Sequence, residues 1–190
     1  MNALQSLLET SAGAKINRWI DNSIQYFGRI PEALIAFVGR FSIAAVFWKS
    51  GQTKVEGFAL DIVDGTFQLG WPRLSDTTLY LFQEEYQLPF ISPELAAPLA
   101  AFAEHLFPTL LLFGLATRFS ALALLVMTLV IQLFVYPGAY PTHGTWAAVF
   151  LYLMAKGGGL LSIDHWIARE AKAKVTGQAE TTWIRIGRRG

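Results

Sequence analysis

The sequence predicts an all-α fold: a four-helix transmembrane bundle, with an amphipathic N-terminal helix and an outer-face segment that contains a short helix between spans one and two. Only 15% of the 190 residues are charged and 53% are hydrophobic, whereas a soluble domain averages about 25% charged residues. The apolar residues are gathered into four long, nearly uncharged runs, as in helices that cross a bilayer. This composition excludes a disordered chain and disfavours a single soluble core.

Four spans are predicted, and each has about the 20 residues that a helix needs to cross the hydrocarbon of a bilayer. They cover about residues 33–50, 95–115, 119–136 and 145–163. The strict alternation of apolar and polar residues that marks membrane β-strands is not seen in them. Helices buried inside a soluble protein are the alternative, but the run that begins at Phe119 lacks the polar face that such helices keep.

The Lys and Arg residues outside the spans predict the orientation of the bundle. One side carries ten of them: Lys15, Arg18, Arg29, Arg118, Arg169, Lys172, Lys174, Arg185, Arg188 and Arg189. The segment between spans one and two instead has Lys54 and Arg73 beside seven acidic residues. Both termini are therefore predicted in the cytoplasm, with residues 55–93 on the outer side of the membrane.

Residues 1–31 are predicted to contain an amphipathic helix on the cytoplasmic face of the membrane, because apolar residues recur there at helical spacing among charged ones. These apolar residues are Ile16, Trp19, Ile20, Ile24 and Phe27. A signal peptide is not indicated, since an apolar stretch after a charged start is missing. Packing of this helix against the bundle is the alternative to contact with lipid.

The outer segment, residues 55–93, is predicted to contain a second short helix. Ser75 or Asp76 can cap its first turn, and the helix ends before Pro89. This helix too has two alternatives, contact with lipid and packing against the bundle. Beyond the membrane domain of residues 32–167, residues 168–190 are basic and polar and form a predicted cytoplasmic tail.

Six polar or charged residues lie within the predicted spans or at their ends. They are Arg40, Lys49, Glu104, His105, Gln132 and Lys156. A charged group at the middle of a membrane costs at least roughly 2.5–3.5 kcal/mol on insertion scales, so such a group needs a partner or a function. These six are therefore the candidate ligand-binding residues.

Arg40 and Glu104 are predicted to form an ion pair near the middle of the membrane. Arg40 lies about eight residues, near 12 Å, into span one, and Glu104 about nine residues into span two from the opposite face. Pro108 cannot donate to the carbonyl of Glu104 and is expected to kink the helix there. Two interpretations stay open: the pair fixes the packing of the two spans, or a polar pocket opens beside it for a small molecule or a proton.

The other polar positions have structural alternatives. His105 points about 100° away from Glu104 around its helix, and as a lone membrane histidine it is more simply a packing residue than a haem ligand. Lys156 can extend its stem to the cytoplasmic interface. The residues after it weaken a helix by about 1 kcal/mol each relative to alanine and permit a break, before Asp164 closes the span. They are Gly157, Gly158 and Gly159.

Known catalytic and metal-binding patterns are absent from the sequence. The chain has no cysteine, which excludes disulfides, thiolate metal sites and covalent haem attachment. Its three histidines, His105, His143 and His165, fall at different predicted depths, against a bis-histidine haem or a three-histidine metal site. No phosphate-binding glycine loop, zinc-protease motif or nucleophile elbow is present. We expect no metal and no haem, and any enzymatic role would be that of an accessory subunit.

Three motifs follow one another along the spans. The first has Arg40 in span one and Lys54 at its exit, and the second has Glu104 followed by Gly114-Leu-Ala-Thr-Arg118. The third is the glycine-rich stretch that ends in Leu-Ser-Ile-Asp164. Together they resemble the DoxX family of small four-span bacterial membrane proteins, over about residues 33–167. Two departures are the length of the outer segment and Gly159, where the family more often has arginine.

The resemblance implies a function in a membrane redox or stress-related process. Some relatives are membrane subunits associated with thiosulfate-to-quinone oxidoreduction, and others belong to membrane complexes tied to oxidative stress. The implied ligand is a quinone or another lipophilic small molecule, which Arg40, Glu104 and His105 would hydrogen-bond. The alternatives are a non-enzymatic scaffold or accessory protein and a small-molecule transporter. Expected partners are the lipid bilayer, membrane or soluble subunits, or a second copy of the chain; nucleic acid is not expected.

Overall fold

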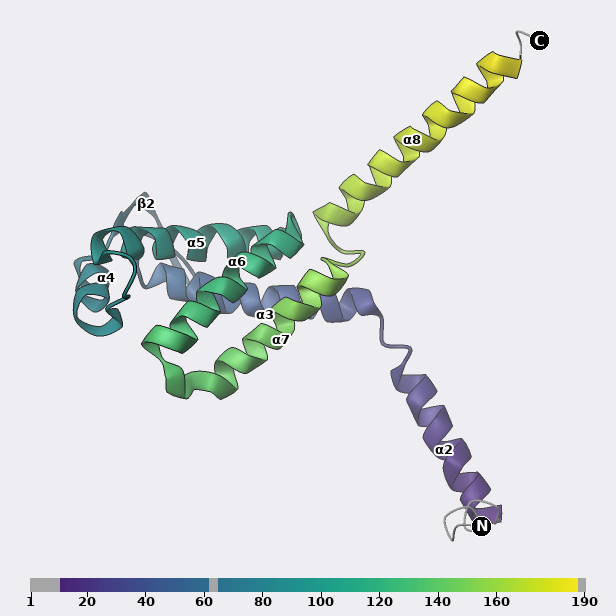
Figure 1. Ribbon diagram of the computed structural model, residues 1–190, viewed down its shortest axis with the longest axis horizontal. Helices are drawn as coiled ribbons and strands as arrows, with labels where there is room; N and C mark the ends of the chain where they lie inside the picture. Colours follow the sequence, from purple (N-terminus) through teal and green to yellow (C-terminus); the bar gives the residue numbers. More distant parts are fainter. Residues whose placement is uncertain (1–10, 62–64, 188–190) are drawn as a thin grey trace.

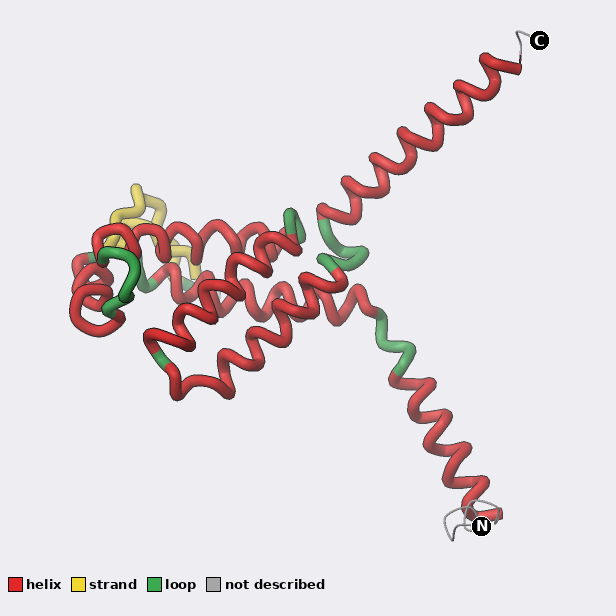
Figure 2. The backbone as a smooth tube through the Cα atoms, in the orientation of Figure 1, coloured by secondary structure: helices red, strands yellow, loops and turns green. Residues whose placement is uncertain are grey.

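The protein is a bundle of helices from which two further helices extend, as the computed structural model shows (Figure 1). The structure describes residues 11–61 and 65–187, and the side chains of residues 13–61 and 65–175. Four helices form the bundle: α3 (Glu32–Gln52), α5 (Pro93–Phe113), α6 (Thr117–Val130) and α7 (Tyr140–Lys156). A two-stranded hairpin and short helices cover one end of this bundle (Figure 2).

Three helices of the described residues are long and apolar enough to cross a membrane: Glu32–Gln52, Pro93–Phe113 and Thr117–Val135. They correspond to the first three predicted spans. The helix at the fourth predicted span is shorter than expected, because α7 has 17 residues and ends at Lys156 rather than near residue 163. At 1.5 Å per residue α7 is about 25 Å long, a little shorter than the hydrocarbon of a bilayer. The four-span bundle is thus not confirmed, and the crossing by α7 stays a prediction.

The bundle packs as two pairs, with α3 along α5 and α6 along α7. Its core contains Ile43, Phe47, Leu111, Leu124, Phe150 and Leu153. Many large apolar side chains of the same helices face outward, among them Phe37, Phe41, Leu99, Phe102 and Leu129. An exterior this apolar is unusual for a soluble domain and typical of a surface that meets lipid.

The outer segment begins with a β-hairpin that the sequence analysis did not predict. Strand β1 (Val55–Asp61) pairs antiparallel with β2 (Thr66–Leu74), and a bulge between Glu56 and Phe58 interrupts their register. Trp48 holds the hairpin to α3, since its indole nitrogen donates to the carbonyl of Leu60 at 2.9 Å.

The predicted short helix is present after the hairpin. It is α4 (Asp76–Leu81), and its N-cap is Ser75, whose hydroxyl accepts a hydrogen bond from the backbone nitrogen of Thr78. A π-helical turn, η1 (Phe82–Tyr86), continues it and packs against the first turns of α5. One face of this segment packs against the bundle, with Phe82 buried against Ala96 and Ala97.

A second π-helical turn, η2 (Ile131–Val135), ends α6 and lies against η1. Tyr136 joins the two turns, because its hydroxyl donates to Glu85 Oε1 at 2.5 Å and its ring stands edge-on to that of Tyr86. The hydrogen bond to this carboxylate raises the pKa of Tyr136 above its ordinary value. A short 3-10 turn, η3 (Pro137–Ala139), then leads into α7.

The helices α2 (Ser11–Phe27) and α8 (Ile163–Gly187) both leave the bundle at the end away from the hairpin (Figure 1). The predicted amphipathic helix is thus present as α2. Its apolar side chains are exposed: Ile16, Trp19, Ile20, Ile24 and Phe27. The predicted tail continues the helix α8 as far as Gly187, and residues 1–10 and 188–190 lie outside the described residues.

Candidate functional site

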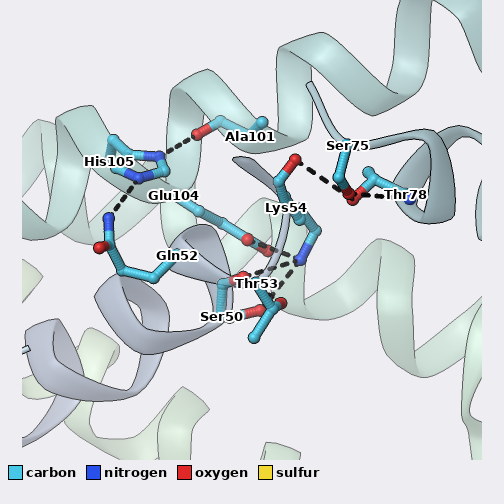
Figure 3. Close-up of polar contacts among 9 residues, drawn as sticks. All are labelled: Ser50, Gln52, Thr53, Lys54, Ser75, Thr78, Ala101, Glu104 and His105. Carbon is cyan, nitrogen blue, oxygen red and sulfur yellow. Dashed lines mark hydrogen bonds and ion pairs between the residues drawn. The ribbon is translucent and has the colours of Figure 1, made fainter. Parts of the chain in front are cut away.

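Glu104 forms an ion pair with Lys54, not with Arg40 as the sequence analysis predicted. Lys54 Nζ lies 2.7 Å from Glu104 Oε2, and the two side chains are 12% and 4% exposed. The same ammonium donates to Ser50 Oγ at 3.1 Å (Figure 3). Glu104 Oε2 receives no well-aligned hydrogen bond from a described residue. Its contact with Lys54 is therefore a close ion pair whose angles do not meet those of a hydrogen bond.

The register of α3 against α5 explains the change of partner. Gly51, at the end of α3, faces Glu104 so closely that a Cβ there would lie 3.0 Å from the Glu104 carbonyl oxygen. Arg40 lies eleven residues earlier on α3, which is about 16 Å along the helix axis. The first turns of α5 extend past α3 and pack against α4 and η1, so depths counted from the start of each span do not correspond.

Lys54 is held by the N-terminus of α4. Its carbonyl oxygen accepts from the backbone nitrogen of Ser75 at 3.0 Å and from the hydroxyl of Thr78 at 3.2 Å. The hydroxyls of Ser75 and Thr78 are themselves 2.8 Å apart (Figure 3). The chain that leaves α3 is therefore fixed, and the Lys54 side chain points back to the carboxylate of α5.

His105, one residue from Glu104, has a hydrogen-bond partner at each of its two ring nitrogens. Its Nδ1 lies 2.7 Å from the carbonyl oxygen of Ala101, and its Nε2 lies 2.8 Å from the amide nitrogen of Gln52 (Figure 3). Since a carbonyl oxygen only accepts, Nδ1 carries the proton and Nε2 accepts from Gln52. His105 thus links α5 to the end of α3 through Gln52.

Arg40 binds backbone carbonyls at the opposite end of α5. It is 1% exposed, and its Nη1 donates to the carbonyls of Leu111 and Leu112 at 3.0 and 3.1 Å. Its Nη2 donates to the carbonyl of Leu161 in the loop after α7. The carbonyls of Leu111 and Leu112 lie in the last turn of α5, where a cation is favourable. That of Leu111 also accepts from the backbone nitrogen of Gly114 at 3.0 Å. Arg40 thus links α3 to the end of α5 and to the loop after α7.

Asp164 binds the chain close to the end of α5 where Arg40 binds. Its two carboxylate oxygens accept from the backbone nitrogens of Ala116 and Thr117 at 2.7 and 2.8 Å. It therefore caps the start of α6 from the start of α8. Gly114 lies at the end of α5, between Arg40 and Asp164, and has a φ of +67°. A Cβ there would lie 2.5 Å from Arg40 Nη1. Arg40, Gly114 and Asp164 thus meet in one cluster, which we call the Arg40 joint. Each of them belongs to a different one of the three sequence motifs.

The remaining predicted site residues lie apart from Glu104. Lys156 ends α7 and pairs with Glu32 at 2.6 Å on the surface, and Lys49 lies 3.7 Å from Asp61. Gln132 belongs to η2 and accepts from His143. The predicted helix break occurs after Lys156, at Gly157, Gly158 and Gly159. Pro108 lies inside α5, which continues as one helix from Pro93 to Phe113.

A cavity of about 720 Å³ opens beside the Lys54–Glu104 pair. Its walls come from α3, α5, α6, the start of α7 and both π-helical turns, and most of the side chains in them are aliphatic or aromatic. Its lining also includes the polar residues Ser50, Lys54, Glu104 and His143, and the two tyrosines Tyr86 and Tyr136. An apolar cavity with a few placed polar groups is typical of sites for small lipophilic molecules.

Four of these lining residues were not among the candidates from the sequence: Ser50, Tyr86, Tyr136 and His143. Lys54 was noted only as the exit of span one. The spacing of Ser50 and Lys54, four residues apart, places them on one face of a helical turn and could have indicated a shared role. Within residues 11–61 and 65–187, no group of three or more His, Asp or Glu residues could hold a metal ion.

These features define a helical membrane protein with a lipophilic cavity and a buried ion pair in its wall. The family model of DoxX matches residues 35–137 of the chain, which includes Arg40, Lys54 and Glu104. Because this match covers more than half of the chain, the protein belongs to the DoxX family. No curated protein and no solved structure matches the chain.

Proposed function

We propose that this protein binds a quinone or another lipophilic small molecule with a polar head in the cavity beside Lys54 and Glu104. In this role it serves as a membrane subunit in a redox or stress-related process in the bacterial inner membrane, with both termini in the cytoplasm. The observation that carries the proposal is a nearly buried ion pair in the wall of an otherwise apolar cavity.

The chemistry of the pair suits the oxygen atoms of a quinone. The ammonium of Lys54 and the hydroxyl of Ser50 are donors for a ring carbonyl, and the carboxylate of Glu104 is an acceptor for a ring hydroxyl. Glu104 Oε2 has no well-aligned donor among the described residues, which leaves room for a hydroxyl of the ligand. Aliphatic and aromatic walls favour the apolar part of the molecule.

The shape of the bundle favours binding over transport. At the level of Arg40 the interior is filled, with Leu111, Leu124 and Leu153 fully buried. A transporter would need a path through this packed core, whereas a site for a membrane-soluble ligand needs only access from one side. Without cysteine, an electron carrier such as an iron–sulfur cluster on thiolates belongs to a partner subunit.

The test is a binding titration with the full chain in lipid nanodiscs and a decyl-substituted benzoquinone as the probe. We expect saturable binding that Lys54→Met weakens by about tenfold or more, the value of one charge-assisted hydrogen bond, and Glu104→Gln should weaken the binding of the reduced, hydroquinone form of the probe by a similar factor. Lys156→Met is the matched control, because it removes a lysine from an exposed ion pair far from the cavity. Absence of saturable binding by the wild type, or equal binding by all four proteins, would overturn the proposal.

A further inference from the structure

The cavity has a second polar wall, at His143 in the first turn of α7. His143 is 6% exposed and lines the same cavity as Lys54 and Glu104. Its Nδ1 lies 2.7 Å from Gln132 Oε1, and its ring packs against that of Trp146 at 5.2 Å between centroids. Gln132 Nε2 in turn donates to the carbonyl of Pro137 at 2.6 Å. His143 has no role in the packing of the Arg40 joint or in the ion pair.

The direction of these hydrogen bonds fixes which nitrogen of His143 carries the proton. The carbonyl of Pro137 can only accept, so the amide nitrogen of Gln132 must face it and the amide oxygen must face His143. That oxygen also only accepts, so Nδ1 of His143 is the donor. In the neutral imidazole, Nε2 is then an acceptor. No partner for Nε2 is present in the part of the chain that the structure describes.

We infer that Nε2 of His143 accepts a hydrogen bond from a hydroxyl group of the ligand, so that the cavity prefers the hydroquinone to the quinone. The inference rests on the proposed function. A quinone offers two acceptor oxygens, which suit Lys54 but repel the lone pair of His143. A hydroquinone oxygen both accepts and donates, so this form alone satisfies Lys54 on one wall and Glu104 and His143 as acceptors.

Gln132 is a positioning residue in this account, since it holds His143 in the tautomer that leaves Nε2 as an acceptor. Its place in the π-helical turn η2 is consistent with this role, because such turns often occur at functional sites. The same turn supplies Ile131 and Val135 to the cavity wall.

The experiment compares a decyl-substituted hydroquinone with its dimethyl ether, which keeps the ring and tail but has no hydroxyl hydrogen. Both are titrated without oxygen into the full chain in nanodiscs. We expect the wild type to bind the hydroquinone more tightly, and His143→Phe to reduce that preference by about two- to tenfold, the value of one net hydrogen bond. Affinity for the ether should stay within about twofold in the variant, because the hydrogen bond to Nε2 is not made by the ether.

Two further variants sharpen the result. His165→Phe removes a histidine at the other end of the bundle and should keep the full preference. Gln132→Leu leaves His143 in place but removes the acceptor that keeps the proton on Nδ1, so either ring nitrogen can carry it. This variant should also lower the preference for the hydroquinone, and it replaces His143→Phe if that protein does not fold. A preference unchanged in both His143→Phe and Gln132→Leu, with binding intact, overturns this inference alone. Absence of saturable binding of either compound by the wild type overturns the proposed function and this inference together.

Discussion

The ammonium of Lys54 lies 2.7 Å from a carboxylate oxygen of Glu104, where the chain leaving α3 passes α5. Two nearly buried charges of opposite sign, next to a largely apolar cavity, stabilise each other only while both are present. The pair is also within reach of a molecule in that cavity. Its geometry therefore has consequences for stability as well as for binding.

Removing one partner of this pair should destabilise the protein more than removing both. Glu104→Leu leaves the ammonium of Lys54 without its counter-charge, and we expect a loss of about 3–5 kcal/mol in the free energy of unfolding. The double variant Lys54→Met with Glu104→Leu should recover much of that loss. Unfolding in mixed micelles, followed by circular dichroism, measures both; a double variant as unstable as the worse single variant would contradict the pairing.

Arg40 should be needed for stability but not for the binding of a ligand. Arg40→Lys keeps the charge but loses the planar fork that reaches three carbonyls, and we expect a cost of about 2–4 kcal/mol. Arg118→Lys is the matched control, since Arg118 donates to one exposed carbonyl, that of Met154, and should cost under about 1 kcal/mol. Thermal unfolding compares the two, and an Arg40→Lys protein as stable as Arg118→Lys would contradict the structural role.

Gly114 should tolerate no side chain. Gly114→Ala must keep a φ of +67° and place a Cβ 2.4 Å from Ser162 Cβ, so we expect a loss of more than about 3 kcal/mol. Gly65 provides an unusually close control, because its φ is +68° and a Cβ there meets nothing within 4 Å. Gly65→Ala should cost only the backbone term, about 1–2 kcal/mol. Equal stability of the two variants would contradict the close packing around Gly114.

The hydrogen bond between Tyr136 and Glu85 should make stability depend on pH in the alkaline range. The bond raises the folded-state pKa of Tyr136 above its ordinary value of 10.0. A raised pKa contributes stability that is fully present below the unfolded-state value and is lost as the pH rises through the folded-state value. The difference in melting temperature between wild type and Tyr136→Phe should therefore be constant below about pH 9 and shrink above pH 10. A difference that grows above pH 10 would contradict this bond.

The spans were predictable because their signal is local. Apolar runs of about 20 residues specify a membrane helix whatever lies beside it, and three of them match helices of that kind. The cap at Ser75 and the break after Lys156 are equally local, since they depend on a side chain or a glycine at one position. The same holds for the amphipathic spacing of Ile16, Trp19 and Ile20 in α2.

The hairpin could have been predicted but was not. Phe67, Leu69 and Trp71 alternate with polar or small residues, and an Asp-Gly pair ends at Gly65 between the two strands. This alternation and this dipeptide are the usual signals of a β-hairpin.

The partner of Glu104 could not have been predicted from span lengths, because pairing depends on the register between two helices. That register is set by the packing of α4 and η1 on the first turns of α5, which are contacts between distant parts of the chain. The contacts of Arg40 could not have been predicted either. Its partners are backbone carbonyls, and every residue has one, so the sequence does not indicate which of them it binds.

The most direct test of the central claim is photo-labelling of the full chain in nanodiscs with an azido-benzoquinone that carries a decyl tail, followed by mass spectrometry of the peptides. The account predicts labelling of cavity residues such as Phe107, Met127 and Trp146, suppressed by an excess of unlabelled quinone and reduced by Lys54→Met. Labelling confined to outward-facing residues such as Phe41 and Phe119, and unaffected by competitor, would contradict it.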